Sequence, residues 1–265
     1  MMSYARSEVD IDGVRVEAVL PDKNFGKTPL LFVHGGCHGS WCWRHYLDYF
    51  ATNGHACFAL NWYNHNGSKS LPLEQFIQRS LLDVTEELEK VADYLGVQPI
   101  FVGHSMGGMV CQQYAQTHKL PGLVLITSVV PKQLNVDAIP LPAPIDVNTV
   151  FGIPPFEMAQ ELFFQTVDEE EARADYALLC DESPVAALEA LEHRLSVDAT
   201  LISCPVLVVG AELDRLTPEP YERALATYYQ ADYLSFEGLG HNVLTAPRWS
   251  EVAGGIQSWL DTKGL

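Results

Sequence analysis

The chain has 265 residues, of which 48% are hydrophobic and 19% charged, and its formal net charge is −18. This balance is typical of a globular protein and excludes an intrinsically disordered one. The excess of acidic residues argues against nucleic acid and against anionic membranes as partners, because phosphate groups are bound by lysine and arginine, which this chain lacks in number.

The first part of the chain predicts a β-hairpin, followed by alternating strands and helices. Asp12–Gly13 lies between two alternating segments, which is the usual signal of a two-residue hairpin turn. Residues 30–33 are apolar throughout, as expected of a strand that is covered on both faces. The predicted elements are strands over 7–11, 14–20, 30–33 and 56–60 and a helix over 43–52.

The middle of the chain predicts a long helix and then a strand, a helix and a strand. Apolar residues recur with helical spacing over 74–95, and Gly96 is placed to end that helix. The elements that follow are a strand over 99–102, a helix over 109–118 and a strand over 123–127.

Alternation of strands and helices stops between residues 131 and 199, where the sequence is rich in proline. Two patches there, 156–164 and 186–195, have helical character. Alternation then resumes with a strand over 206–209, a helix over 218–229, a strand over 233–236 and a helix over 249–260. The simplest fold is α/β, with a doubly wound, mostly parallel eight-stranded sheet and a helical insertion after the sixth strand. We therefore predict a core of residues 1–130 and 200–265 and a helical cap of residues 131–199, called the cap segment below.

The segment Gly103-His104-Ser105-Met106-Gly107 is the most informative motif of the chain. A G-x-S-x-G motif between a strand and a helix holds its serine on a strained turn, and glycines on either side let the strand and the helix pass closely. Unpaired backbone N–H groups at the start of a helix favour negative charge beside Ser105. These features predict that Ser105 is a catalytic nucleophile.

A nucleophilic serine needs a histidine to accept its proton and a carboxylate to orient that histidine. Asp214 follows the predicted strand 206–209, and His241 follows the last predicted strand. Both therefore lie at carboxyl ends of the sheet, where the sites of open α/β proteins occur. We predict His241 as the general base and Asp214 as its carboxylate, with Glu212 of the same loop as the alternative.

Two backbone N–H groups are predicted to form an oxyanion hole. One belongs to Met106, and the other comes from the loop after strand 30–33, where Gly35 and Gly36 let the backbone approach a substrate carbonyl. Gly36 is the predicted second donor, and Cys37 is the alternative.

The cap segment is rich in aromatic and aliphatic side chains and poor in cations. We expect it to cover Ser105 and to bind an apolar part of the substrate. The predicted substrate-binding residues are Cys37, Phe151, Phe156, Phe163 and Phe164.

The cysteines and the chain start give weaker signals. No basic region followed by an apolar stretch opens the chain, and no apolar run reaches the length of a membrane span, so we expect a cytoplasmic protein. We expect it to be a monomer or a homodimer. The six cysteines include no C-x-x-C motif and are expected to be free thiols. Cys37, His38, Cys42 and His45 form a dense group but fit no zinc spacing, so no metal site is predicted.

Taken together, these motifs resemble those of serine esterases of the α/β-hydrolase superfamily over essentially the whole chain. The segment 34–43 is similar to the corresponding loop of the plant methylesterase and hydroxynitrile lyase branch. Lyases of that branch carry threonine in this loop and lysine after the histidine, where this chain has Gly36 and Asn242. The turn Asn64–Ser68 also departs from the Gly-His-Gly turn of many relatives. The resemblance thus implies an esterase rather than a lyase.

The motifs and the resemblance imply hydrolysis of a carboxylic ester, thioester or lactone of an apolar small molecule through an acyl-enzyme, with no metal or organic cofactor. An acyltransferase or perhydrolase would use the same residues with an acceptor other than water. A small-molecule receptor with a retained hydrolase site is a third possibility.

Overall fold

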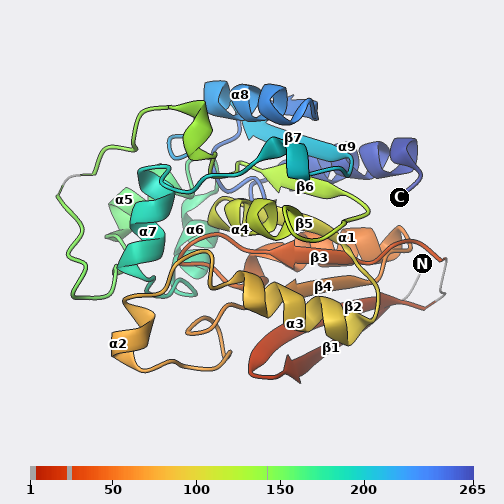
Figure 1. Ribbon diagram of the computed structural model, residues 1–265, viewed down its shortest axis with the longest axis horizontal. Helices are drawn as coiled ribbons and strands as arrows, with labels where there is room; N and C mark the ends of the chain where they lie inside the picture. The colour runs from red at the N-terminus through yellow and green to blue at the C-terminus, as the bar shows by residue number, and fades with distance from the viewer. Residues whose placement is uncertain (1–3, 23–25, 142) are drawn as a thin grey trace.

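The computed structural model describes residues 4–22, 26–141 and 143–265. Within these ranges eight strands form one sheet in the order β1-β2-β4-β3-β5-β6-β7-β8, antiparallel from β1 to β4 and parallel from β4 to β8 (Figure 1). The strands are β1 Tyr4–Ile11, β2 Val14–Pro21, β3 Leu30–Val33, β4 Cys57–Leu60, β5 Ile100–His104, β6 Leu123–Ile126, β7 Val206–Ala211 and β8 Asp232–Phe236. The helices are α1 Arg44–Thr52, α2 Leu73–Phe76, α3 Thr85–Leu95, α4 Met106–Ala115, α5 Phe156–Leu162, α6 Glu169–Tyr176, α7 Pro184–Leu191, α8 Glu219–Tyr229 and α9 Trp249–Lys263. The predicted fold class is confirmed.

The strand order reverses at β3, which pairs with β4 on one side and with β5 on the other. Because the chain leaves β3 and β5 toward opposite faces of the sheet, the loops after these two strands lie next to each other at the carboxyl edge. The loop beginning at His34 and the turn at Ser105 are therefore brought together by topology.

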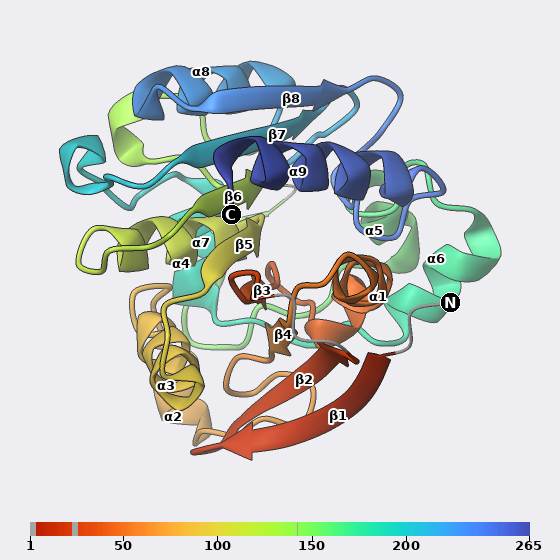
Figure 2. The same ribbon diagram turned by 90° about the vertical axis from the view of Figure 1, so that its right-hand side faces the viewer.

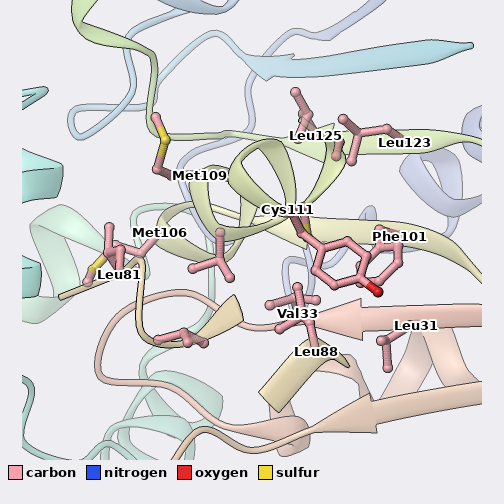
Figure 3. Packing of buried hydrophobic residues seen from close by; sticks show 14 of the residues in the cluster. Leu31, Val33, Leu81, Leu88, Phe101, Met106, Met109, Cys111, Leu123 and Leu125 are labelled. Carbon is pink, nitrogen blue, oxygen red and sulfur yellow. The ribbon is translucent and has the colours of Figure 1, made fainter. Parts of the chain in front are cut away.

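Helices cover both faces of the sheet, with α1 and α9 on one face and α3, α4 and α8 on the other (Figure 2). Successive residues of β3 point to opposite faces, so Leu31 and Val33 join the core under α3 and α4, while Leu30 and Phe32 join the core under α1 and α9. Figure 3 shows the first of these cores, where Phe101 and Cys111 pack with Leu31 and Val33. Each such buried side chain contributes roughly 1.5–3 kcal/mol of burial free energy.

The predicted helix over 74–95 is wrong in its first half. The chain forms the short α2 and then α3, with an irregular stretch between them. Glu189 of α7 accepts hydrogen bonds there from the Ser80 hydroxyl (2.7 Å) and the Leu81 N–H (2.8 Å), and the Ser183 hydroxyl donates to the carbonyl of Arg79 (2.6 Å). These tertiary contacts replace the helical hydrogen bonds of the stretch. The predicted end at Gly96 is confirmed, since Gly96 has φ +67° and caps α3.

The cap segment contributes α5, α6 and α7, which gather beyond one end of the sheet, away from the C-terminus (Figure 1). The helix α6 was not among the helical patches predicted from the sequence. Its signal was Asp168, whose side chain accepts the Glu171 N–H as an N-cap, followed by acidic residues in the first helical turn. In the described ranges, no helix is long and apolar enough to span a bilayer.

Candidate active site

Ser105 sits on a left-handed turn between β5 and α4, with φ +53° and ψ −120°. Backbone hydrogen bonds hold this strained residue on both sides: the Ser105 N–H donates to Ile126 O at the end of β6 (3.0 Å), and the N–H of Val129, beyond that strand, donates to Ser105 O (3.1 Å). The serine is 8% exposed and lines the cavity described below. The helix that starts at Met106 directs its free N–H groups toward this position.

The turn requires a glycine on each side, as the sequence predicted. A Cβ on Gly103 would lie 2.7 Å from Gly107 O, and a Cβ on Gly107 would lie 2.2 Å from His34 O. Both contacts are with backbone atoms, which cannot rotate away. The close passage of β5, α4 and the end of β3 therefore depends on these two glycines.

His241 and Asp214 form a buried hydrogen-bonded pair, with 2.8 Å between Nδ1 of the imidazole and Oδ2 of the carboxylate. The same carboxylate accepts the Leu216 and Thr217 N–H groups (2.8 and 3.0 Å) and the Thr217 hydroxyl (2.7 Å). A carboxylate held by four donors has a fixed orientation. It therefore keeps the proton of His241 on Nδ1 and leaves Nε2 as the basic nitrogen.

The backbone of His241 is held equally firmly. Its carbonyl accepts the Thr127 hydroxyl and Nε2 of His104, each at 3.1 Å, and its N–H donates to Gln165 Oε1 of the cap segment (2.9 Å). Burial and then the neighbouring His241 lower the pKa of His104 well below its usual value. His104 is therefore a neutral donor that positions the His241 loop.

Glu212, the alternative acid, lies away from this pair. It is exposed and accepts the N–H of Gly238 (2.8 Å). A second acid, Glu222 of α8, is fully buried, and burial followed by the charge of Asp214 raises its pKa well above the usual value. Asp214 is consequently the acid of this group that contacts His241.

The loop after β3 packs directly against the Ser105 turn. A Cβ on Gly35 would lie 2.9 Å from Ser105 Cβ, and one on Gly36 would lie 2.2 Å from the Met106 sulfur. Among the described residues, neither the Gly36 N–H nor the Met106 N–H has a hydrogen-bond acceptor. The Cys37 N–H, by contrast, donates to Glu182 Oε2 (3.3 Å). Gly36 and Met106 thus each have a free N–H among the residues that line the cavity with Ser105.

One cavity is lined by Ser105, His241, Gly36 and Met106 together with apolar side chains of the cap segment. Three of the five predicted substrate-binding residues line it: Cys37, Phe151 and Phe163. Phe156 and Phe164 do not. Phe156 packs edge-on against Tyr176 beneath Arg173, and Phe164 is fully buried, so both belong to the core of the cap segment itself.

Most of the remaining cavity wall was not predicted from the sequence. The missed apolar residues are Val129, Leu141, Pro154, Met158, Leu162, Ala187, Ala190, Leu191 and Leu216. A signal existed in α7, where Ala187, Ala190 and Leu191 have the i, i+3, i+4 spacing of one helix face. Glu182 also lines the cavity, and nothing local in the sequence marked it.

The cysteine and histidine group at 37–45 is dispersed in space. Cys42 is buried under α1, while His45 stacks on Trp249. Burial lowers the pKa of His38 to about 4, and its Nδ1 donates to Gly36 O (2.8 Å), so His38 supports the loop after β3. Within the described residues, no three side chains of the metal-binding types are grouped to hold an ion.

Comparison with known proteins places these features in a family. A model of the alpha/beta hydrolase family matches residues 30–253. Methylesterase 4 of Arabidopsis thaliana is 28% identical over 191 residues, which cover 67% of this chain and 69% of that protein. Monoacylglycerol lipase of Mycolicibacterium smegmatis is 24% identical over 98% of this chain and 99% of its own length.

A solved structure has the same fold. A thermophilic esterase from Thermogutta terrifontis superposes with a TM-score of 0.70 at 19% identity, covering 98% of this chain and 99% of the other. The resemblance to plant methylesterases that the loop 34–43 indicated is confirmed by the Arabidopsis relative. Since the family model spans most of the chain, this protein belongs to the alpha/beta hydrolase family.

Proposed function

We propose that this protein hydrolyses carboxylic esters of apolar small molecules, with Ser105 as nucleophile, His241 as general base and Asp214 as its orienting carboxylate. The observation that carries the proposal is the convergence of Ser105, the His241–Asp214 pair and the two free N–H groups of Gly36 and Met106 on one apolar cavity. The names of the relatives, a methylesterase and a monoacylglycerol lipase, agree with ester hydrolysis.

In the acylation step, Ser105 Oγ attacks the ester carbonyl carbon and its proton passes to His241 Nε2. The carbonyl oxygen becomes an oxyanion, which accepts hydrogen bonds from the Gly36 and Met106 N–H groups. Collapse of this intermediate breaks the bond to the alcohol oxygen, which leaves with the proton from His241. The acyl group remains on Ser105.

In the deacylation step, water attacks the acyl carbon while His241 accepts one of its protons. The same two N–H groups hold the second oxyanion. When the bond to Ser105 Oγ breaks, His241 returns the proton to the serine and a carboxylic acid is released. Asp214 stays ionised throughout and stabilises the imidazolium in both steps.

The cavity favours an apolar acyl or alcohol group. Its wall away from Ser105 consists of side chains such as Leu141, Phe151, Met158 and Leu162, with no lysine or arginine among the residues that line it in the described part of the chain. We propose that the cap segment, residues 131–199, is the element that selects the substrate, because most of these side chains belong to it.

Replacing Ser105 by alanine should lower kcat for p-nitrophenyl esters by roughly 10⁴- to 10⁶-fold, since the remaining groups have no nucleophile to activate. The exposed Ser258→Ala variant is the matched control and should keep wild-type turnover. Steady-state hydrolysis and thermal unfolding of both variants give the comparison. A folded S105A protein with more than about a tenth of wild-type kcat would move the nucleophile elsewhere.

Asp214→Asn should lower kcat by about 10⁴-fold, because an amide at this position favours the wrong tautomer of His241. Glu212→Gln in the same loop should leave kcat within about twofold, since its carboxylate only accepts the Gly238 N–H at the surface. Ester hydrolysis by the two variants is measured side by side. The reverse order of damage would assign the acid role to Glu212.

Activity should rise with acyl chain length over short straight-chain esters, by up to roughly fourfold in kcat/KM per methylene, and then level off where the cavity ends. Met158→Ala should flatten this dependence by removing part of the apolar wall, with acetate ester hydrolysis unchanged. Leu178→Ala, which is exposed in the same cap segment, is the control. An unchanged chain-length profile in M158A would locate selectivity outside the cap segment.

A further inference from the structure

A buried ionic contact joins the cap segment to the core beside the candidate oxyanion hole. Glu182 of the cap segment and His65 of the turn after β4 are both almost fully buried, and Nε2 of His65 lies 3.1 Å from Glu182 Oε2. Neither residue has a role in the steps described above. A buried ion pair costs desolvation free energy and needs further hydrogen bonds to persist.

Those hydrogen bonds are present on both partners. Glu182 accepts the Ser183 N–H at Oε1 (2.8 Å) and the Cys37 N–H at Oε2 (3.3 Å). His65 faces acceptors with both nitrogens, since its Nδ1 lies 3.0 Å from Tyr63 O. A doubly protonated histidine donates at both contacts, and the two backbone N–H groups that Glu182 accepts favour its ionised form. The pair is therefore a carboxylate and an imidazolium.

The electrostatics agree with that assignment. Burial by itself would lower the pKa of His65, but the Glu182 charge and the hydrogen bonds that His65 donates to Cys180 and Glu182 raise it well above its usual value. Burial likewise opposes ionisation of Glu182, yet the His65 charge lowers its pKa. Other titratable groups that act on the pair or its neighbours are His34, His38, Cys37, Cys180, Asp181, and Glu87 with its partner Arg79.

Through Glu182, this ion pair contacts the loop that carries Gly36. Cys37 has φ +62°, a strained conformation for a residue with a side chain. The cap segment makes hydrogen bonds to both backbone groups of Cys37. The Cys180 N–H donates to Cys37 O (2.9 Å), and the Cys37 N–H donates to Glu182. Glu182 is anchored in turn by two 2.9 Å backbone hydrogen bonds with Phe151.

We propose that Glu182 is a positioning residue, which, held by His65, keeps Cys37 in its strained conformation and so aims the neighbouring Gly36 N–H at the substrate oxyanion. The cap segment would then set the rate of the chemical step as well as selectivity. This inference rests on the proposed function, because it assigns a support to the oxyanion hole named there. A donor displaced by a fraction of an ångström loses much of its effect on the transition state.

The test compares two substitutions of Glu182 with a control. Glu182→Met removes the acceptor and should lower kcat by roughly 10- to 100-fold, with KM changed less than about threefold. Glu182→Gln can keep an oxygen at the Oε2 position for both the Cys37 N–H and Nε2 of His65, with its amide nitrogen at the Oε1 position, so kcat should stay within about threefold of wild type. Arg44→Met breaks a different ion pair between core and cap segment, with Asp175, and should lower Tm while leaving kcat unchanged.

Hydrogen–deuterium exchange provides a second readout that is independent of activity. Amides of residues 34–38 should exchange faster in E182M than in wild type and should remain protected in R44M. If E182M loses only Tm, as R44M does, with unchanged kcat and exchange, Glu182 is structural and the inference fails. If wild type hydrolyses no ester while exchange in E182M rises as expected, the proposed function fails and the support of the loop stands.

The pH dependence of Tm separates the ion pair from simple packing. A raised pKa at His65 stabilises the fold below the ordinary histidine pKa, about 6.5, and this contribution is lost as pH rises through the raised value. The lowered pKa of Glu182 adds stability that is lost as pH falls through it. The Tm gap between wild type and His65→Gln should thus be roughly 5–10 °C near neutral pH and should shrink toward alkaline pH.

A constant Tm gap across that range would overturn the ionised state of the pair. Should E182M not fold, His65→Gln carries the kinetic test, with an expected loss of roughly 3- to 10-fold in kcat at neutral pH. A folded H65Q protein with kcat within twofold of wild type and with normal exchange at 34–38 would overturn the proposal.

Discussion

The left-handed turn at Ser105 is the constraint on which the rest of the site depends. A serine at φ +53° persists because Ile126 at the end of β6 binds its N–H and Val129, just beyond β6, binds its carbonyl, and because Gly103 and Gly107 allow β5 and α4 to pass at backbone contact. The same turn starts α4 one residue later, so that free N–H groups of the helix lie beside the serine oxygen. Strain at one residue thus places the serine that we propose as nucleophile beside the N-terminal end of a helix, which favours negative charge.

The other parts of the site reach this turn through the topology of the sheet. The reversal of strand order at β3 brings the Gly36 loop next to Ser105, while the loops after β7 and β8 carry Asp214 and His241 to the same carboxyl edge. The cap segment closes the cavity from beyond that edge and also holds His241 through Gln165. The cap segment therefore contacts the backbone of His241 in addition to lining the cavity.

Features determined by local sequence could be predicted, and features determined by distant contacts could not. The strands, the turn at Ser105 and the end of α3 at Gly96 could be predicted because apolar runs and glycines determine the local backbone conformation at their own positions. The break before α3 depends on Glu189, which is distant in sequence. Phe156 and Phe163 have the same local character, but Phe163 lines the cavity while Phe156 packs on Tyr176, and only the docking of α5 decides between them. The buried Glu182–His65 pair is likewise a product of tertiary structure.

A fluorophosphonate probe tests most directly whether Ser105 Oγ is the nucleophile that accepts the acyl group. Peptide mass mapping after stoichiometric labelling locates the adduct, and residual esterase activity is measured on the same sample. We expect one adduct per chain, on the peptide that contains Ser105, with turnover lost in proportion to labelling. Full loss of activity with the adduct on another residue, or full activity with Ser105 labelled, would contradict the account.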